Sequence, residues 1–427
     1  MQTIFQSENI PVEYRADVLV VGGGIAGIAA ALSAARTLKA SGKAENDGRC
    51  ENNRIRVLLA ERQYMLGGLA TAGLVTIYLP LCDGLGKQVS FSIAEELLRL
   101  SLPLWHNAER GYNDWIAHPE THHTDRSPRF EVDFNPQLFA LAAEKLLAEN
   151  GVEIFYGATL CGVQKQNGTV THAIFESKSE RRSGRFAVEA KSVVDASGDL
   201  DAGNAAGVDV RLYEHGNVPA AWYYSSSPDA PYALHMLGYA ETPEEMAGTA
   251  TQPKRLSSKR INGVNGKEIS DFIQLAHGAL LKDFLTSRQE NGDFQISTMA
   301  TIPQIRMSRA LVTRKPLRIA ENHLRQSDSV GLIADWRKRG VVLEVPFSAL
   351  YSESADNLIC AGRCVAVADD NTWDMARVIP CCAVTGEAAG LAAAMLSESG
   401  DVRGFSELNI KDLQAKLEAR GVKLHED

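Results

Sequence analysis

Three glycines near the N-terminus have the spacing of a phosphate-binding turn. The stretch Gly22-Gly23-Gly24-Ile25-Ala26-Gly27 fits the pattern G-x-G-x-x-G between a predicted apolar strand over 17–21 and a predicted helix over 25–40. In such a turn, Gly22 permits the tight bend, Gly24 lets a pyrophosphate approach the backbone, and Gly27 lets the helix pack closely on the strand. Unpaired N–H groups at the start of the helix attract the phosphates. The pattern predicts a dinucleotide site formed by Gly22, Gly24, Ile25, Ala26 and Gly27.

An acidic residue follows the next predicted strand, which covers 56–60. The Glu61 carboxylate can accept hydrogen bonds from both hydroxyls of an adenosine ribose, and it would repel a 2′-phosphate. Glu61 lies 34 residues beyond Gly27, farther than the usual ~20 residues, because a polar stretch predicted to be an exposed loop occupies 41–53. These residues favour FAD or NAD over a phosphorylated adenosine, and they leave the choice between the two open.

Later segments resemble those by which flavoproteins of the glutathione-reductase fold return to one extended dinucleotide. They are Gly67-Gly68-Leu69-Ala70-Thr71, the strand end Asp195-Ala196-Ser197-Gly198-Asp199, and Ala361-Gly362-Arg363 with the helix that opens around 380–386. Together with the stretches 335–340, 345–347, 357–364 and 377–380, they resemble the FAD-dependent oxidoreductase family, which is related to the fumarate reductase and succinate dehydrogenase flavoproteins. The resemblance extends from Asp17 to about Leu424. It is weakest over 213–267, where a substrate preference would be set.

The resemblance implies that FAD is the cofactor. It also implies noncovalent binding, since no histidine lies between Gly73 and Leu81 to form a covalent flavin link. The helix start at 380–386, with Pro380 in its first turn, would face N1 and O2 of the flavin, and Arg377 would add a fixed positive charge. The implied cofactor residues beyond the first turn are Glu61, Arg62, Gly67, Gly68, Leu69, Ala70, Thr71, Ser197, Gly198, Asp199, Gly362, Arg363, Arg377, Val378 and Cys381.

The activity implied by the resemblance is hydride transfer between a small organic substrate and N5 of the flavin. The sequence does not identify the electron donor or acceptor that completes the reaction. Arg306 and Arg377 are the candidate catalytic residues. The resemblance places Arg306 and Arg309 in a segment that enters the catalytic cleft, where a guanidinium would orient a substrate carboxylate if the substrate carries one. Two alternatives stay open: a flavin subunit that relays electrons to a partner redox protein, and an NAD-linked dehydrogenase.

Composition excludes several other classes of protein. The 427 residues are 45% hydrophobic and 23% charged, as in an ordinary globular protein. A formal net charge of −9 provides no overall field that attracts nucleic acid. No unbroken apolar stretch reaches the ~20 residues of a membrane span, and no secretory signal is visible, which predicts a cytoplasmic protein. The 7 cysteines include no C-x-x-C pair, so no metal site is predicted. The oligomeric state stays open.

The predicted fold class is α/β: a Rossmann-like FAD-binding domain of the glutathione-reductase type with an inserted α+β substrate domain. The resemblance implies that the FAD-binding domain is discontinuous, over 1–78, 130–212 and 341–427. The substrate or cap domain is predicted to cover 79–129 and 213–340. Within the cap, apolar residues at helical spacing predict helices over 270–289 and 328–339.

Overall fold

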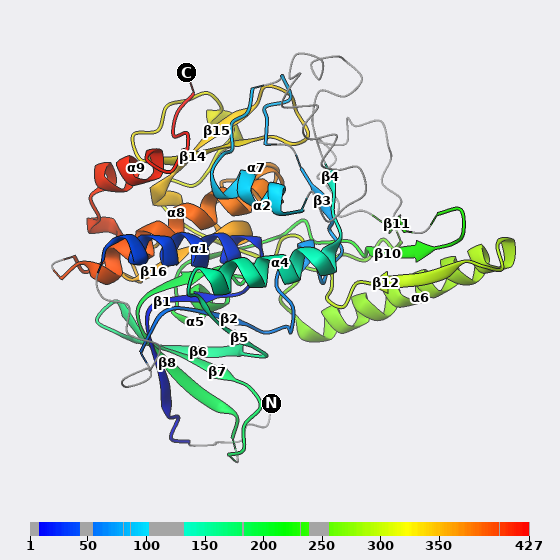
Figure 1. The fold of residues 1–427 in the computed structure, drawn as a ribbon, viewed down its shortest axis with the longest axis horizontal. Helices are drawn as coiled ribbons and strands as arrows, with labels where there is room; N and C mark the ends of the chain where they lie inside the picture. The colour runs from blue at the N-terminus through cyan, green and yellow to red at the C-terminus, as the bar shows by residue number, and fades with distance from the viewer. Residues whose placement is uncertain are drawn as a thin grey trace.

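A computed structural model describes residues 8–42, 54–79, 81–85, 87–101, 132–181, 183–230, 232–238, 256–400 and 402–426. Most of the predicted loop over 41–53 and most of the first cap segment over 79–129 lie outside these residues. The described chain forms a large sheet covered by helices, with a smaller sheet and a long helix to one side (Figure 1).

The large sheet has seven strands in the order β5-β2-β1-β8-β7-β6, and β16 also pairs with β8. Strands β5, β2, β1, β8 and β16 run parallel, whereas β8, β7 and β6 form an antiparallel meander. At the carboxyl edge, Val21 of β1 pairs with Ala60 of β2 and with Asp195 of β8. The predicted motifs therefore meet at one edge of the sheet. The bounds are β1 Val12–Val21, β2 Arg54–Glu61, β5 Glu153–Tyr156, β6 Thr159–Gln166, β7 Thr169–Glu176, β8 Arg185–Asp195 and β16 Leu358–Cys360.

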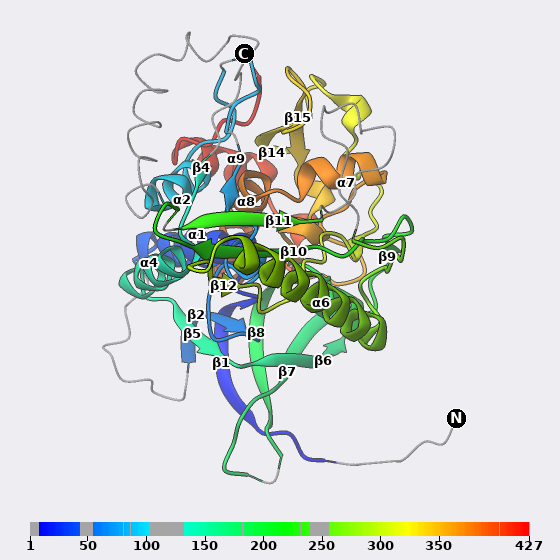
Figure 2. The ribbon, with the colours of Figure 1, turned by 90° about the vertical axis from the view of Figure 1, so that its right-hand side faces the viewer.

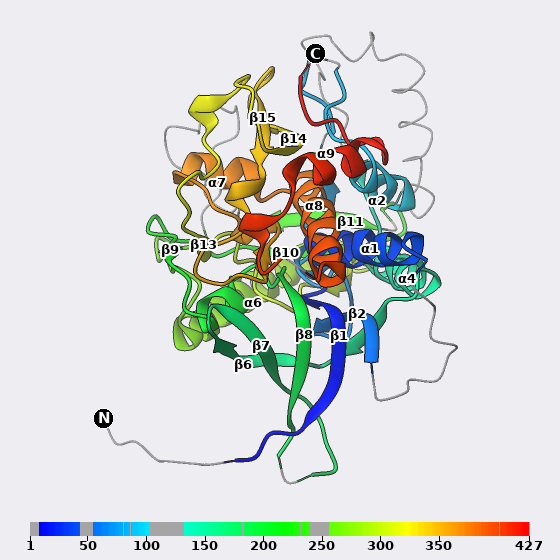
Figure 3. The ribbon, with the colours of Figure 1, turned by 90° about the vertical axis from the view of Figure 1, so that its left-hand side faces the viewer.

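Two core helices lie side by side over this sheet, α1 (Ile25–Ala40) and α8 (Ile379–Glu398), as Figures 1 and 3 show. A Cβ atom at Gly390 would stand 2.0 Å from the Ala30 carbonyl oxygen, so the contact requires glycine. In the described part of the chain, α8 is the one helix with the length and apolar character of a membrane span. Its apolar window is 94% buried inside the protein, which makes α8 a helix of the protein core.

The remaining elements include one capped helix and one correction to a sequence prediction. Asn135 caps the helix that follows Pro136, because its side chain accepts the N–H of Leu138 at 3.0 Å. The predicted helix over 328–339 is wrong: residues 329–334 form a wholly buried strand, and a short buried apolar run does not distinguish strand from helix. The elements are α2 Ile93–Ser101, α4 Pro136–Glu149, α5 Asp201–Ala205, α7 Asp370–Ala376 and α9 Ile410–Glu418, with the strand pairs β3 Ile77–Tyr78 and β4 Val132–Asp133, β9 Val210–Leu212 and β13 Arg309–Leu311, and β14 Ser329–Ala334 and β15 Val342–Pro346.

The smaller sheet has the order β11-β10-β12 and lies beside the long helix α6 (Gly266–Glu290), which contains the helix predicted over 270–289 (Figures 1 and 2). Its strands are β10 (Ala221–Ser226), β11 (Ala233–Leu237) and β12 (Gln295–Met299). Side chains of β10 alternate: Tyr223 packs with residues of α6, whereas Trp222 and Tyr224 pack with Leu74 of the segment after the Gly-Gly pair. The smaller sheet thus presents aromatic residues to the large-sheet side. The domain boundaries themselves remain a prediction.

Candidate functional site

The glycine turn joins β1 to α1. Gly22 has φ +100° and donates its N–H to the Ala60 carbonyl at 2.8 Å, a backbone conformation that favours glycine. A Cβ atom at Gly27 would stand 1.8 Å from the Gly22 carbonyl oxygen, so only glycine lets α1 start this close to the strand. A Cβ atom at Gly24 would meet no described atom within 4 Å. The open space at Gly24 lies where the N–H groups of Ile25 to Gly27 attract phosphate.

Glu61 ends β2 with a buried carboxylate beside the glycine turn. Its Oε2 accepts the N–H of Gly23 at 2.6 Å, and its Oε1 accepts the N–H of Gln63 at 2.7 Å. The two backbone bonds fix the carboxylate, and each oxygen keeps the capacity to accept a further hydrogen bond. Ribose hydroxyls are held in this way by an acid at this strand end.

The Gly-Gly segment packs directly on the glycine turn. Gly67 donates its N–H to the Gly23 carbonyl at 2.8 Å and forms a parallel bridge with Gly24. A Cβ atom at Gly68 would stand 3.3 Å from the Cα atom of Gly24. The Gly-Gly segment therefore borders the open space at Gly24. The predicted residues Leu69, Ala70 and Thr71 follow, in and directly after the short helix η2 (Gly68–Ala70).

The end of strand β8 also packs against the glycine turn. A Cβ atom at Gly22 would stand 2.6 Å from the Ala196 carbonyl oxygen. The next residue, Ser197, donates its hydroxyl to Oδ1 of Asp195 at 2.6 Å. Gly198 has φ +80° and turns the chain away. The predicted residues of this segment thus lie beside the first turn.

Arg62 and Asp199 connect the second strand to this third segment. Nη2 of Arg62 lies 3.6 Å from Oδ2 of Asp199, and Oδ1 of Asp199 accepts the hydroxyl of Ser308 at 2.6 Å. Burial raises the pKa of the nearby Asp201 carboxyl to about 6, with the charge of Asp199 adding to the effect. The ion pair between Arg62 and Asp199 joins two predicted cofactor residues at the carboxyl edge of the sheet.

The segment around Gly362 lies against both core helices, close to Ala26 of α1 and Cys382 of α8. A Cβ atom at Gly362 would stand 2.7 Å from the Cβ atom of Ala26, so the short helix η8 (Gly362–Cys364) touches α1. Nη1 of Arg363 donates to the carbonyl oxygens of Ile305 and Arg306 at 2.8 and 3.1 Å. Arg363 therefore joins the cofactor segments to the stretch that carries Arg306.

Helix α8 begins at Ile379, directly after the predicted residues Arg377 and Val378. Cys381 lies in its first turn and is buried. Burial raises the pKa of the Cys381 thiol well above its usual range, which keeps the thiol protonated and unreactive. The helix begins one residue before the predicted range 380–386, and the predicted contact of Cys381 with the cofactor stays a prediction.

Arg377 belongs to a buried network of paired charges. Its Nε donates to Oδ1 of Asp374 at 2.9 Å. Asp374 also binds Nη1 of Arg337 at 2.9 Å, and Nε of Arg337 lies 2.8 Å from Oδ1 of Asp335. Two guanidiniums thus face two carboxylates. Arg377 is thus paired with a carboxylate of the protein, and its predicted role at the flavin stays a prediction.

Arg306 has a different environment. It is 4% exposed, and Nη2 donates to Oε1 of Gln304 at 3.3 Å, whereas Nε has no hydrogen-bond partner in the described chain. The guanidinium carbon lies 5.0 Å from the centre of the Trp222 ring. The amide of Gln304 donates to the Gly73 carbonyl at 2.5 Å. Arg306 is thus placed between the aromatic strand β10 and the end of the Gly-Gly segment.

Positive charges surround Arg306. Burial lowers the pKa of its guanidinium well below the usual value, and the neighbouring guanidiniums of Arg377 and Arg363 lower it further. Asp374 opposes this effect, but that carboxylate already binds Arg337 and Arg377. Arg306 therefore carries a charge that the described protein does not balance.

Three residues that position this site are absent from the sequence predictions. Oδ1 of Asn217 accepts the backbone N–H of Arg306 at 2.8 Å, while Gln304 and Trp222 hold its side chain. The aromatic run around Trp222 is the only sequence signal among them. Arg309, by contrast, lies 3.2 Å from Oδ1 of Asp201 and has a structural pairing.

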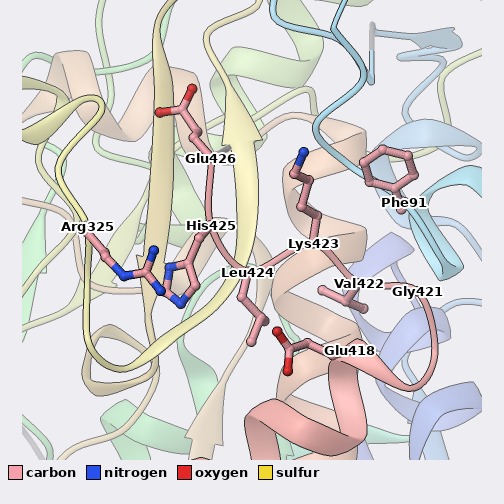
Figure 4. A pocket seen from close by; sticks show the side chains of 9 residues that line it. All are labelled: Phe91, Arg325, Glu418, Gly421, Val422, Lys423, Leu424, His425 and Glu426. Atoms are coloured by element: carbon pink, nitrogen blue, oxygen red, sulfur yellow. The ribbon is translucent and has the colours of Figure 1, made fainter.

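A separate cavity of about 620 Å³ lies at the C-terminal segment, away from these residues. Figure 4 shows its side chains. His425, on its wall, pairs with the buried Glu344 at 2.9 Å. The cavity contains none of the predicted site residues. Its charged and aromatic lining is Phe91, Arg325, Glu418, Lys423, His425 and Glu426.

The residues at the glycine turn fit an adenine dinucleotide. Open space at Gly24, the start of α1 and the fixed Glu61 carboxylate match the pyrophosphate and ribose of an adenine dinucleotide. A parallel sheet with this glycine turn at its carboxyl edge defines the Rossmann-like nucleotide-binding class. The family follows from the sequence: the model described as "FAD dependent oxidoreductase" matches residues 17–258 and 320–417. The chain belongs to this family, and it is an FAD-dependent oxidoreductase.

The two matched ranges leave out residues 259–319. The match covers residues 213–258 of the stretch where the sequence predicts the weakest resemblance, and it leaves out 259–267. Arg306 and Arg309 lie in the range that the match leaves out, so the role that the resemblance implies for them stays a prediction.

Solved structures resemble the chain only distantly. A geranylgeranyl bacteriochlorophyll reductase-like protein from Thermoplasma acidophilum is 15% identical with a TM-score of 0.45, over 95% of this chain and 84% of that one. p-Nitrophenol 4-monooxygenase from Pseudomonas putida DLL-E4 is 12% identical with a TM-score of 0.44, over 98% and 90%. L-Amino acid deaminase from Proteus myxofaciens is 14% identical with a TM-score of 0.41, over 92% of each chain. No curated protein matches the chain.

Proposed function

We propose that this FAD-dependent oxidoreductase acts on a small organic substrate that lies between strand β10 and the cofactor segments, next to Arg306. The observation that carries the proposal is the convergence of Arg306, Trp222 and Gln304 on the end of the Gly-Gly segment at Gly73. When bound, FAD supplies the redox chemistry, with N5 as the atom that exchanges hydride.

The chain's own residues bind and orient the two reactants. In the proposal, the first turn of α1 and Glu61 hold the adenosine end of the cofactor, while Gly67, Gly68, Ser197, Gly198 and Gly362 line its path. The start of α8 adds a partial positive charge at the flavin end. The aromatic side chains of β10 exclude water from the substrate, and Arg306 orients it.

The electron donor or acceptor that returns the flavin to its starting state is unidentified. The family match supports an enzyme with FAD, and nothing favours an NAD-linked dehydrogenase or an electron-relay subunit. We expect a discontinuous FAD-binding domain over 1–78, 130–212 and 341–427, a cap over the remaining residues, and a cytoplasmic location.

An anaerobic titration tests the proposal. The FAD-loaded protein is mixed with a panel of alcohols, amines, 2-hydroxy acids and unsaturated acids, the last after chemical reduction of the flavin, and the flavin absorbance is followed. The proposal expects a stoichiometric change with at least one compound in the absence of another protein, slower when the reacting C–H bond is deuterated. A flavin that responds only to a copurified redox protein would contradict it and support electron relay.

A further inference from the structure

The long helix α6 has two different faces. Its inner face packs against the smaller sheet, where the buried residues Ala276 and Leu280 cluster with Tyr223 of β10. On the opposite face, Leu281 is 56% exposed and Leu285 is 52% exposed. Figures 1 and 2 show α6 at the outer side of the smaller sheet. The outer face of α6 therefore carries apolar side chains that the described residues leave more than half exposed.

The outer face has a regular arrangement along the helix. Single exposed leucines are ordinary on a protein surface, so the arrangement carries the argument rather than the leucines alone. Residues of this face recur at alternating spacings of four and three, the spacing by which one helix packs along another. We call them the outer row: Lys267, Asp271, Gln274, Gly278, Leu281, Leu285 and Arg288.

The middle of the outer row is complementary in shape to an antiparallel copy of itself. A Cβ atom at Gly278 would meet no described atom within 4 Å, so the helix surface is open there. When Leu281 of a second copy lies opposite Gly278, a large side chain meets this open surface. The same spacing then places Leu285 of each copy opposite Gln274 of the other. Because the arrangement has two-fold symmetry, each of these layers occurs twice.

The ends of the outer row are complementary in charge in the same register. The next layer outward places Arg288 of one copy opposite Asp271 of the other, once at each end. The described partner of Arg288 is the carbonyl oxygen of Phe294 at 2.8 Å, and no described carboxylate pairs with it. Asp271 pairs with Lys267 and Lys259 at the surface, and such exposed pairs exchange partners at little cost. Opposite charges thus meet at both ends.

We propose that the outer row of α6 is a dimerisation surface, and that its partner is the outer row of a second copy of this chain. The two helices pack antiparallel about a two-fold axis at the level of residues 279 and 280. The inner face of α6 stays on the smaller sheet, where the hydroxyl of Tyr223 donates to Oδ2 of Asp283 at 2.6 Å. The cofactor segments of each copy therefore lie outside the interface, and the proposal does not depend on the substrate or the reaction.

Sedimentation equilibrium of the FAD-loaded full chain measures the association. We expect a species of twice the chain mass of 46.3 kDa, with a dissociation constant in the micromolar range. Leu281→Glu should raise this constant about 100-fold or more, because a symmetric interface loses the burial of the leucine twice. Glutamate forms helices well, so the fold should be unchanged. The control is Leu141→Glu on α4, at a side chain that is 63% exposed, which should dimerise as the wild type does.

Two charge variants test the antiparallel register. Asp271→Arg alone and Arg288→Asp alone place like charges opposite each other at both ends, so each should dimerise weakly. When the two chains are mixed, the introduced charges face each other at one end and the native pair is kept at the other. We expect the mixed dimer to be at least about tenfold tighter than either variant alone at low salt. The difference should shrink at high salt, because these pairs are exposed.

Four results would overturn the inference. The first is a wild-type chain that stays monomeric at about 0.1 mM, well above a micromolar dissociation constant. The second is a dimer that Leu281→Glu leaves intact, which would place the interface elsewhere. The third is a pair of charge variants without preference for each other. The fourth is a monomer that sediments with phosphatidylcholine vesicles except as Leu281→Glu, which would assign the face to a membrane. If Leu281→Glu does not fold, the charge variants still decide.

Discussion

The substitution Gly24→Ala separates the cofactor site from the stability of the fold. The backbone of Gly24 has φ −68° and ψ −178°, which alanine adopts without strain, and the added Cβ atom meets no described atom within 4 Å. Restricting the unfolded chain stabilises by about 0.4–1 kcal/mol, while alanine is a poorer helix cap than glycine by several tenths of a kcal/mol. The free energy of unfolding of the cofactor-free protein should therefore change by less than about 1 kcal/mol.

The same methyl group occupies the space through which a pyrophosphate approaches the start of α1. Loss of one charge-assisted hydrogen bond costs about 1.5–3 kcal/mol, so the FAD dissociation constant should rise roughly 10- to 150-fold. Isothermal titration of cofactor-free protein with FAD measures this change, and urea unfolding of the same sample measures stability.

Gly278→Ala is the matched control, because a Cβ atom at Gly278 of α6 also meets no described atom within 4 Å. It should leave FAD affinity unchanged. If Gly24→Ala binds FAD as tightly as the wild type, the phosphate does not approach the helix at this residue. If it instead unfolds the cofactor-free protein, the space at Gly24 is not open.

Three further substitutions test the packing and charges around the site. Asp374→Asn removes the carboxylate that pairs with Arg377 and leaves Arg337 with Asp335 alone, so it should lower the free energy of unfolding by about 3–5 kcal/mol in urea. Gly390→Ala forces a Cβ atom to 2.0 Å from the Ala30 carbonyl oxygen and should destabilise by about 1–3 kcal/mol in the same assay. Asp201→Asn should remove a pH dependence: burial raises the folded pKa of Asp201 to about 6, above the unfolded value of about 3.9, so its stabilising contribution is full below about pH 4 and is lost as the pH rises through about 6.

Each of these expectations has a clear contrary result. A change below about 1 kcal/mol in Asp374→Asn would mean that the charges are solvated rather than buried. Unchanged stability in Gly390→Ala would mean that α1 and α8 are farther apart than described. For Asp201→Asn, urea unfolding between pH 4 and pH 6 that parallels the wild type would show that Asp201 has an ordinary pKa.

The sequence predicts the parts of this protein that depend on local patterns. The glycine turn, the acid that ends β2 and the start of α8 are each defined by a few adjacent residues with fixed backbone requirements, such as the close approach at Gly27. The helix predicted over 328–339 is wrong, because residues 329–334 form a strand. Six consecutive buried residues do not show whether apolar side chains recur at helical or at strand spacing.

The environment of Arg306 depends on distant contacts. Gln304 reaches Gly73, and Asn217 holds the backbone of Arg306, across 231 and 89 residues of sequence. Nothing in the local sequence of Asn217 indicates this contact, and only the fold shows that Arg306 has no counter-ion among the described residues. The pairing of Arg377 with Asp374 likewise depends on the fold of α7 and on Arg337.

The most direct test of the central claim is the absorbance spectrum of the purified protein, followed by heat denaturation and mass identification of the released chromophore. The account predicts the bands of oxidised flavin and FAD in the supernatant, with none left on the chain. A colourless protein that FAD does not reconstitute, or a flavin that stays attached to the denatured chain, would contradict a noncovalent FAD site at the glycine turn.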